Sequence, residues 1–110
     1  MNKKTLKKKA DLLFSKMVRR VGKCELEGKD SVTCNGVLQC MHIIGRSNHH
    51  LRWDTQNALC GCQGHHMYYT NHPWEFQEMI KVFYPERYEY LNKERHTLWN
   101  GDIQAVLATL

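Results

Sequence analysis

The chain has 110 residues, of which 42% are hydrophobic and 25% charged, as is typical of a soluble globular protein with one small core. It holds no apolar run of membrane-spanning length, and its lysine-rich start is not followed by the apolar core of a signal peptide. We therefore expect one soluble intracellular domain with no membrane partner.

The net charge of +5 is concentrated at the N-terminus. Residues 1–23 carry nine Lys or Arg side chains and one Asp, whereas residues 24–110 carry seven basic and ten acidic side chains. A basic block of this kind suits phosphate neutralisation on nucleic acid. It is equally typical of a solvated helix face that only aids solubility.

The first half of the chain is expected to hold one helix and two strands. Apolar residues at helical spacing predict an amphipathic helix over about residues 4–21, which Gly22 ends. Residues 24–36 are rich in Gly, Asp, Ser and Asn and predict a loop. Residues 37–44 are rich in strand formers and predict a strand, and residues 51–53 predict a short second strand.

The second half is expected to be helical. A helix from about residue 62 to residue 69 is followed by one over residues 74–83, with Pro73 at its first position. Pro85 begins a further helix that runs to about residue 97, and Asp102 caps a last one that ends at Leu110. The large apolar side chains of this half are expected in the core: Trp74, Phe76, Phe83, Tyr88, Leu91, Trp99 and Leu107.

Five cysteines cannot all pair in disulfides, and they lie near histidines, which favours a metal site over a disulfide framework. A thiol-rich domain of this size can use zinc to offset its small core. The alternative is that the thiols are scattered small apolar groups. The cysteines are Cys24, Cys34, Cys40, Cys60 and Cys62.

Two histidines suit hydrolytic chemistry. A strand with His42, a turn with Asn57 and a helix that starts near His66 can fold so that the two imidazoles face each other. Phosphodiester hydrolysis needs a base for water, a cation for the developing charge and a rigid support. A neutral imidazole can be the base, a second one can hold the cation, and an asparagine can fix the loop. Arg46 follows the strand and can clamp a phosphate with its planar fork.

These motifs resemble the HNH, or ββα-metal, nuclease motif of small phage and prophage endonucleases. The resemblance covers about 40 of the 110 residues, between residues 34 and 73. It implies an α+β fold with a ββα-metal core and a structural zinc site. The single domain would comprise a basic N-terminal helix over 1–22, the zinc-bound core over 24–72 and C-terminal helices over 73–110. The matching segments are Leu38–Arg46, Leu51–Asp54, Asn57–Cys60 and Cys62–His66.

The resemblance also implies roles for single residues. His42 would be the general base, Asn57 would orient the catalytic loop, and His66 would bind the catalytic Mg²⁺ or Mn²⁺. A structural zinc would be held by Cys62 and His65 on the C-terminal side. Its other expected ligands are Cys24 and Cys34, with Cys40 and Cys60 as alternates.

One position departs from the family pattern. The residue before the catalytic histidine is often an aspartate that binds the catalytic metal, and here it is Met41, which does not bind hard magnesium. The neighbouring side chains considered as replacement ligands are His72, Asn71 and Asp54.

We therefore expect a DNA endonuclease or nickase in the cytoplasm of a bacterial host cell. By analogy with phage relatives, its partners would be DNA and phage packaging or recombination proteins. The alternative is a non-catalytic zinc-knuckle protein that binds nucleic acid and carries a decayed HNH site. A weaker third interpretation is a redox or metal-sensing module.

Overall fold

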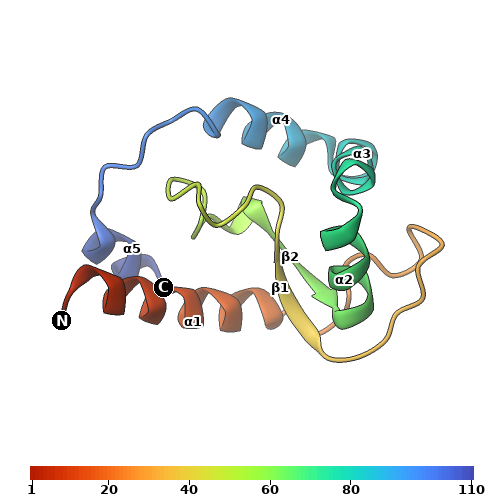
Figure 1. Ribbon diagram of the computed structural model, residues 1–110, viewed down its shortest axis with the longest axis horizontal. Coiled ribbons are helices and arrows are strands. Elements are labelled where there is room, and N and C mark those ends of the chain that lie inside the picture. Colours follow the sequence, from red (N-terminus) through yellow and green to blue (C-terminus); the bar gives the residue numbers. More distant parts are fainter.

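The computed structural model describes residues 1–110, which form an α+β fold of five helices and one two-stranded antiparallel sheet. Figure 1 shows the strands between α1 on one side and the run of α2, α3 and α4 on the other, with α5 returning to α1. None of the helices combines the length and the apolar character needed to cross a membrane. The elements are α1 (Lys3–Arg19), β1 (Leu38–His42), a 3-10 turn (Thr55–Asn57), β2 (Ala58–Cys62), α2 (Gln63–Asn71), α3 (Pro73–Phe83), α4 (Pro85–Glu94) and α5 (Ile103–Thr109).

The second strand, β2, follows the predicted turn and covers residues for which the sequence predicted no strand. β1 confirms the strand expected over 37–44, although it is shorter, but residues 51–53 form turns and that prediction is wrong. The backbone hydrogen bonds of this segment are local, since Leu51 N donates to Asn48 O and Asp54 N donates to Leu51 O. β2 contains few strand formers, yet all five of its residues are buried. Burial on both faces stabilises it where propensity does not.

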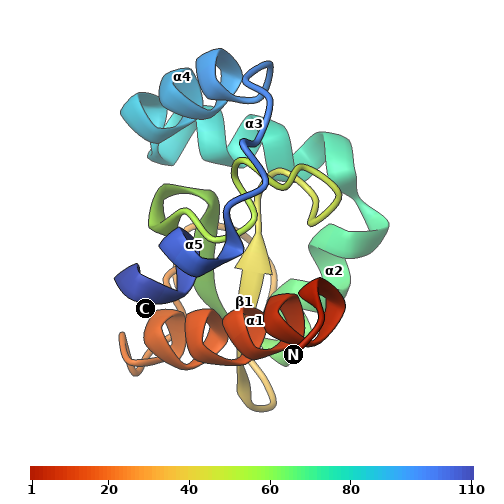
Figure 2. The ribbon, with the colours of Figure 1, turned by 90° about the vertical axis from the view of Figure 1, so that its left-hand side faces the viewer.

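The hairpin separates two apolar clusters. In its register Leu38 lies opposite Cys62, Cys40 opposite Cys60 and His42 opposite Ala58. Figure 2 shows α1 and α5 side by side in front of the sheet. The first cluster joins α1 and α5 to the strands and is formed by Ala10, Phe14, Val18, Trp53, Ala58, Cys60 and Ile103. The second joins α2, α3 and α4 to the strands, and its largest fully buried members are Leu26, Met41, Leu51, Leu59, Ile80 and Leu91.

Proline positions set the boundaries of α3 and α4. Pro73 and Pro85 stand in the first turn of these helices, as predicted. The predicted core is wrong at two positions, because Trp74 is 86% exposed and Phe83 is 45% exposed. The buried face of α3 is formed instead by residues at helical spacing between them, namely Phe76, Met79 and Ile80.

Gly61 makes room for Met41 across the hairpin. Met41 is 1% exposed, and a Cβ atom on Gly61 would overlap its Sδ atom. We expect Gly61→Ala to lower the free energy of unfolding by about 1–3 kcal/mol, the usual cost of overpacking a core. Urea denaturation would measure this loss. Gly45→Ala is the control, because a Cβ there meets nothing within 4 Å; equal losses for the two variants would contradict the prediction.

Candidate functional site

Three thiols and one imidazole converge at the start of α2. The ligand atoms of Cys24, Cys34, Cys62 and His65 all lie within 4.8 Å of one another. His65 Nδ1 is 3.1 Å from Cys62 Sγ and 3.6 Å from the other two sulfurs. A tetrahedral zinc with Zn–S of about 2.3 Å and Zn–N of about 2.0–2.1 Å would separate sulfur from nitrogen by about 3.5 Å. The four predicted residues can therefore hold a metal ion, and their spacing is consistent with a structural zinc.

Local backbone geometry brings these ligands together. Cys62 ends β2 and caps α2, where its Sγ accepts from His65 N at 3.4 Å. Cys24 Sγ accepts from Cys62 N at 3.3 Å. The loop before β1 wraps the same helix start, because Gly64 N donates to Asn35 O at 3.1 Å. One helix N-terminus thus organises ligands from three separate segments.

The surroundings of the cluster shift the pKa values of its thiols in opposite directions. Burial acts to raise the pKa of Cys62, but the backbone N–H and the ring of His65 lower it to about 6. Burial and the neighbouring sulfurs of Cys24 and Cys62 raise the pKa of Cys34 to about 12. Neighbouring thiols with pKa values this far apart do not both ionise near neutral pH unless a cation neutralises them.

Asp30 binds the ring nitrogen of His65 that is not directed at the thiols, a contact that no motif in the sequence indicates. His65 is fully buried, and its Nε2 donates to Asp30 Oδ1 at 2.9 Å. Tyr69 Oη donates to the other carboxylate oxygen at 2.5 Å. Such a partner fixes the ring so that Nδ1 faces the metal position.

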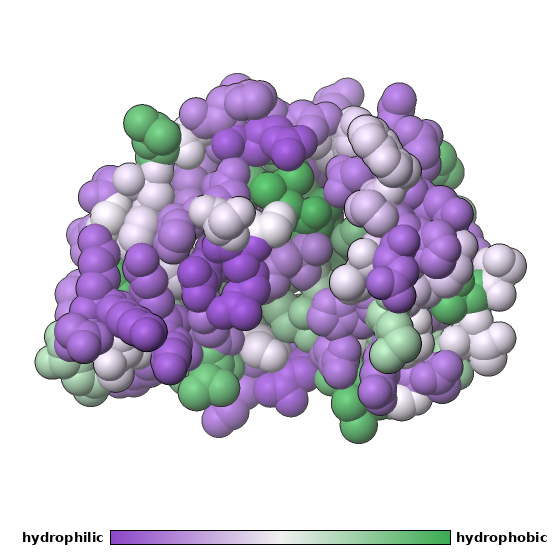
Figure 3. All heavy atoms as spheres, in the orientation of Figure 1, coloured by the Kyte–Doolittle hydropathy of each residue, from purple (hydrophilic) through white to green (hydrophobic).

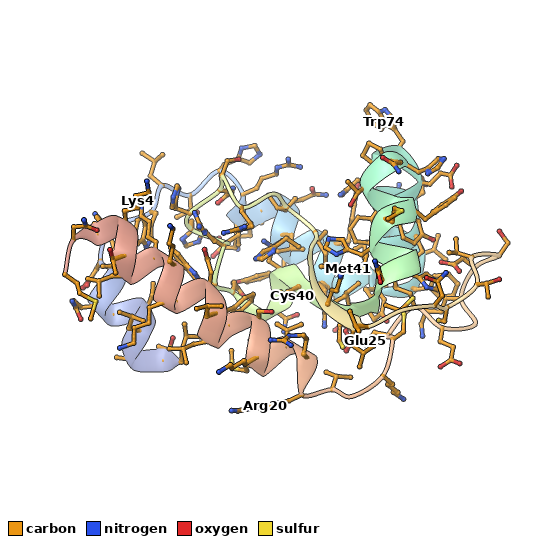
Figure 4. All side chains as sticks on the ribbon, turned by 60° about the horizontal axis from the view of Figure 1, so that its bottom comes forward. Lys4, Arg20, Glu25, Cys40, Met41 and Trp74 are labelled. Atoms are coloured by element: carbon orange, nitrogen blue, oxygen red, sulfur yellow. The ribbon has the colours of Figure 1, made fainter.

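The two alternate thiols lie elsewhere. Cys40 and Cys60 face each other across the hairpin and belong to the α1 side of the sheet. Figure 4 shows Cys40 directed toward α1 and Met41 directed to the opposite face of β1. Neither alternate belongs to the group of four ligands, so Cys24 is the residue that the fold brings to the cluster.

A second site lies on the α1 side of the hairpin. His42 and His66 line one pocket of about 440 Å³, together with Arg46. The structure therefore brings together three of the residues for which the sequence predicted a role in hydrolysis. The remaining lining residues are Asp11, Leu12, Phe14, Ser15 and Cys40, so α1 forms one wall. We call this pocket the groove.

A hydrogen bond to the backbone sets the tautomer of the His42 ring. Its Nε2–H donates to the backbone oxygen of Arg52 at 2.8 Å, which leaves the lone pair on Nδ1 in the neutral ring. The ring of Phe14 on α1 packs against it, with centroids 5.6 Å apart. Burial lowers the pKa of His42, so the imidazole is neutral near pH 7.

His66 presents one nitrogen for a metal. Its Nδ1 lies 2.7 Å from Gln39 Oε1, and donation to this oxygen leaves the lone pair on Nε2. Burial lowers the pKa of His66, which keeps the ring neutral. Because adjacent helical residues point about 100° apart, α2 can direct His65 to the thiols and His66 to the groove. The contact of Gln39 with His66 is one that the sequence did not indicate.

Asn57 organises the loop between the strands without lining the groove. It is fully buried, and its Oδ1 accepts from Ile44 N at 2.7 Å. Its Nδ2 donates to Ile44 O at 2.9 Å and to Leu51 O at 3.1 Å. One amide therefore joins the two ends of the segment that carries Arg46, which is the kind of support that the sequence predicted.

The replacement metal ligands considered from the sequence are not gathered in the groove. His72 Nδ1 donates to Tyr68 O and its ring stacks on Tyr68. Asp54 caps the 3-10 turn and accepts from Tyr90 Oη. Asn71 lines a smaller pocket of about 240 Å³ that His66 also borders.

Searches with protein-family models, among curated proteins and among solved structures each find no significant match to this chain. Inference about function therefore depends on the residues and their geometry.

The cluster predicts one tightly bound zinc ion per chain. Replacing Cys34, Cys62 or His65 should remove it, because three ligands with an open position bind zinc less tightly than four. Loss of the metal should also lower the melting temperature, since binding free energy contributes to folding. Elemental analysis and thermal melts would measure both effects. Cys40→Ser and Cys60→Ser are matched controls that should retain zinc; loss of zinc from these, with retention in Cys24→Ser, would overturn the assignment.

Proposed function

We propose that this protein is an HNH-type, or ββα-metal, endonuclease that hydrolyses phosphodiester bonds in DNA. The observation that carries the proposal is the convergence of His42, His66 and Arg46 on one groove. The consecutive elements β1, β2 and α2 and the neighbouring Cys3His cluster support it, since both belong to the pattern that the sequence resembles.

Each residue has a distinct role in the proposed reaction. His42 Nδ1 takes a proton from the attacking water, while the Arg52 carbonyl keeps the ring in the required tautomer. Arg46 contacts the scissile phosphate through its fork of N–H groups. His66 Nε2 would hold a divalent cation, which would supply positive charge beside the phosphate and the leaving oxygen. The zinc cluster acts only in folding.

The donors of the groove suit a transition metal better than magnesium. His66 offers an imidazole, and the only carboxylate that lines the groove, Asp11, already accepts hydrogen bonds from two arginines and a tryptophan. Met41 lies in the core on the other face of β1, so an acidic residue at that position would be a buried carboxylate. Imidazole sites favour ions such as Co²⁺ or Ni²⁺, and Mn²⁺ accepts a nitrogen ligand more readily than Mg²⁺, which favours oxygen ligands.

The charge of the N-terminal segment supports a nucleic-acid substrate. α1 forms one wall of the groove, and residues 1–23 carry nine basic side chains. Figure 3 shows hydrophilic side chains gathered over the N-terminal part of α1. Contacts from such a helix go mostly to phosphates and do not depend on sequence.

A second candidate function follows from the ligands that the groove lacks. With no free carboxylate for a metal, the same fold could bind nucleic acid through α1 without cleaving it. The zinc cluster and the basic helix would then be the functional parts, and His42 would be a half-buried structural side chain.

Plasmid nicking distinguishes the two functions. Incubated with Mn²⁺ or Co²⁺, the zinc-loaded protein should convert supercoiled plasmid to the nicked form faster than with Mg²⁺. His42→Ala should lower the rate by about 10²- to 10⁴-fold, the usual contribution of a general base. His96→Ala is the control, because that histidine is exposed on the surface. Plasmid binding without nicking, with every metal, would exclude the enzyme and favour the second function.

The pH dependence of nicking reports on His42. Since burial lowers its pKa, the base form persists to lower pH than for an ordinary histidine. The rate at saturating Mn²⁺ should rise with pH through this lowered pKa and be level near neutral pH. Initial rates measured between about pH 5 and pH 8 would show this rise. A rise in the nicking rate centred at a pH above the ordinary pKa of histidine would contradict a base whose pKa is lowered by burial.

A further inference from the structure

One carboxylate on α1 joins the side chains that follow β1. Asp11 Oδ2 accepts from Nη2 of both Arg46 and Arg52 at 2.6 Å. Its Oδ1 accepts from Arg52 Nε at 3.0 Å and from Trp53 Nε1 at 2.9 Å. Asp11 therefore receives four donors from three residues, all of them in the segment between β1 and β2.

Asp11 is held as a charged group. Burial alone would raise the pKa of Asp11, but the hydrogen bond and charge of Arg52, the charge of Arg46 and the hydrogen bond of Trp53 lower it overall. The side chains of Asp11 and Arg52 are only 20% and 15% exposed. A bidentate pair of this kind is both strong and geometrically specific. It is also the only acidic side chain in the basic N-terminal segment, residues 1–23.

Arg52 connects this carboxylate to the candidate base. The guanidinium of Arg52 binds Asp11, and its backbone oxygen accepts from His42 Nε2. Phe14, three residues after Asp11 on α1, packs on the ring of His42. α1 therefore acts on His42 in two ways, through the Arg52 backbone and through an aromatic contact.

Only one nitrogen of the Arg46 guanidinium group is bound within the protein. Asp11 binds only its Nη2, and the side chain is 57% exposed at the edge of the groove. Its other N–H groups are directed to no protein acceptor within hydrogen-bond distance. They are therefore available to a phosphate oxygen.

We propose that Asp11 is a positioning residue of the groove, which holds His42 through Arg52 and aims Arg46 at the scissile phosphate. This inference rests on the proposed nuclease function for its consequence in catalysis. The alternative is that the carboxylate of Asp11 occupies the position of the substrate phosphate and so excludes the substrate from the groove.

The test compares Asp11→Asn, which keeps the shape of the side chain and removes its charge, with the wild type. We expect kcat for plasmid nicking to fall about 10- to 100-fold. Losses of this size are usual when a residue that hydrogen-bonds to a metal ligand and orients it is replaced. Glu89→Gln, on the exposed face of α4, changes the net charge equally and should leave the rate unchanged. Zinc content and melting temperature would establish that each variant is folded.

A second variant addresses the route through Arg52. Arg52→Lys keeps the charge and the backbone oxygen but loses the bidentate fork, so it should reproduce the part of the loss that passes through His42. The double variant should be no slower than the worse single variant, because both changes break one connection. Additive losses would show that Asp11 acts independently of Arg52.

The ¹⁵N shifts of the His42 ring supply a readout that does not require activity. In the wild type Nε2 should carry the proton, and in Asp11→Asn the Nδ1-protonated tautomer should become populated. Faster nicking by Asp11→Asn would mean that Asp11 blocks the groove, and an unchanged rate and tautomer would remove its positioning role. A wild type that never nicks would refute the proposed function alone, because the tautomer would still test whether Asp11 orients His42.

Discussion

The convergence of Cys24, Cys34, Cys62 and His65 is the constraint on which the rest of the structure depends. Only 23 of the 110 residues are buried, so apolar packing is spread over two small clusters. A metal ion held by four residues would join the loop after α1, the loop before β1 and the start of α2 at one point. Asp30 and Tyr69 extend this polar centre into the adjoining helix. The orientation of α2 relative to the hairpin follows from it.

Because α2 is fixed on one side by His65, its next residue is directed elsewhere. His66 lines the groove, where β1 supplies His42 and the loop supplies Arg46. The two sites therefore share a helix but differ in chemistry. One is a closed, thiol-rich cluster of the kind that serves folding, and the other is an open groove with two neutral imidazoles.

The long segment between the strands has little regular structure, and hydrogen bonds from the buried Asn57 and the half-buried Asp11 hold it. Asn57 binds the backbone at Ile44 and Leu51, and Asp11 binds the arginines that follow. Charge-assisted hydrogen bonds have defined directions, so they position side chains more strictly than apolar contacts do. This explains how a loop can present Arg46 and the Arg52 carbonyl in fixed positions beside the groove.

Local signals in the sequence indicate the helices, the first strand and two of the clustered ligands, Cys62 and His65, whereas the fold selects Cys24 and Cys34 over the alternates Cys40 and Cys60. Apolar periodicity marks α1, prolines mark α3 and α4, and the close spacing of Cys62 and His65 marks a metal site, because each signal is local. Tertiary structure alone decided β2, whose small residues become a strand only when both faces are covered. It also decided the contacts of Asp11, Asp30 and Gln39, whose partners lie 27 to 42 residues away. No local pattern encodes such pairs, because they form only when the fold brings distant segments together.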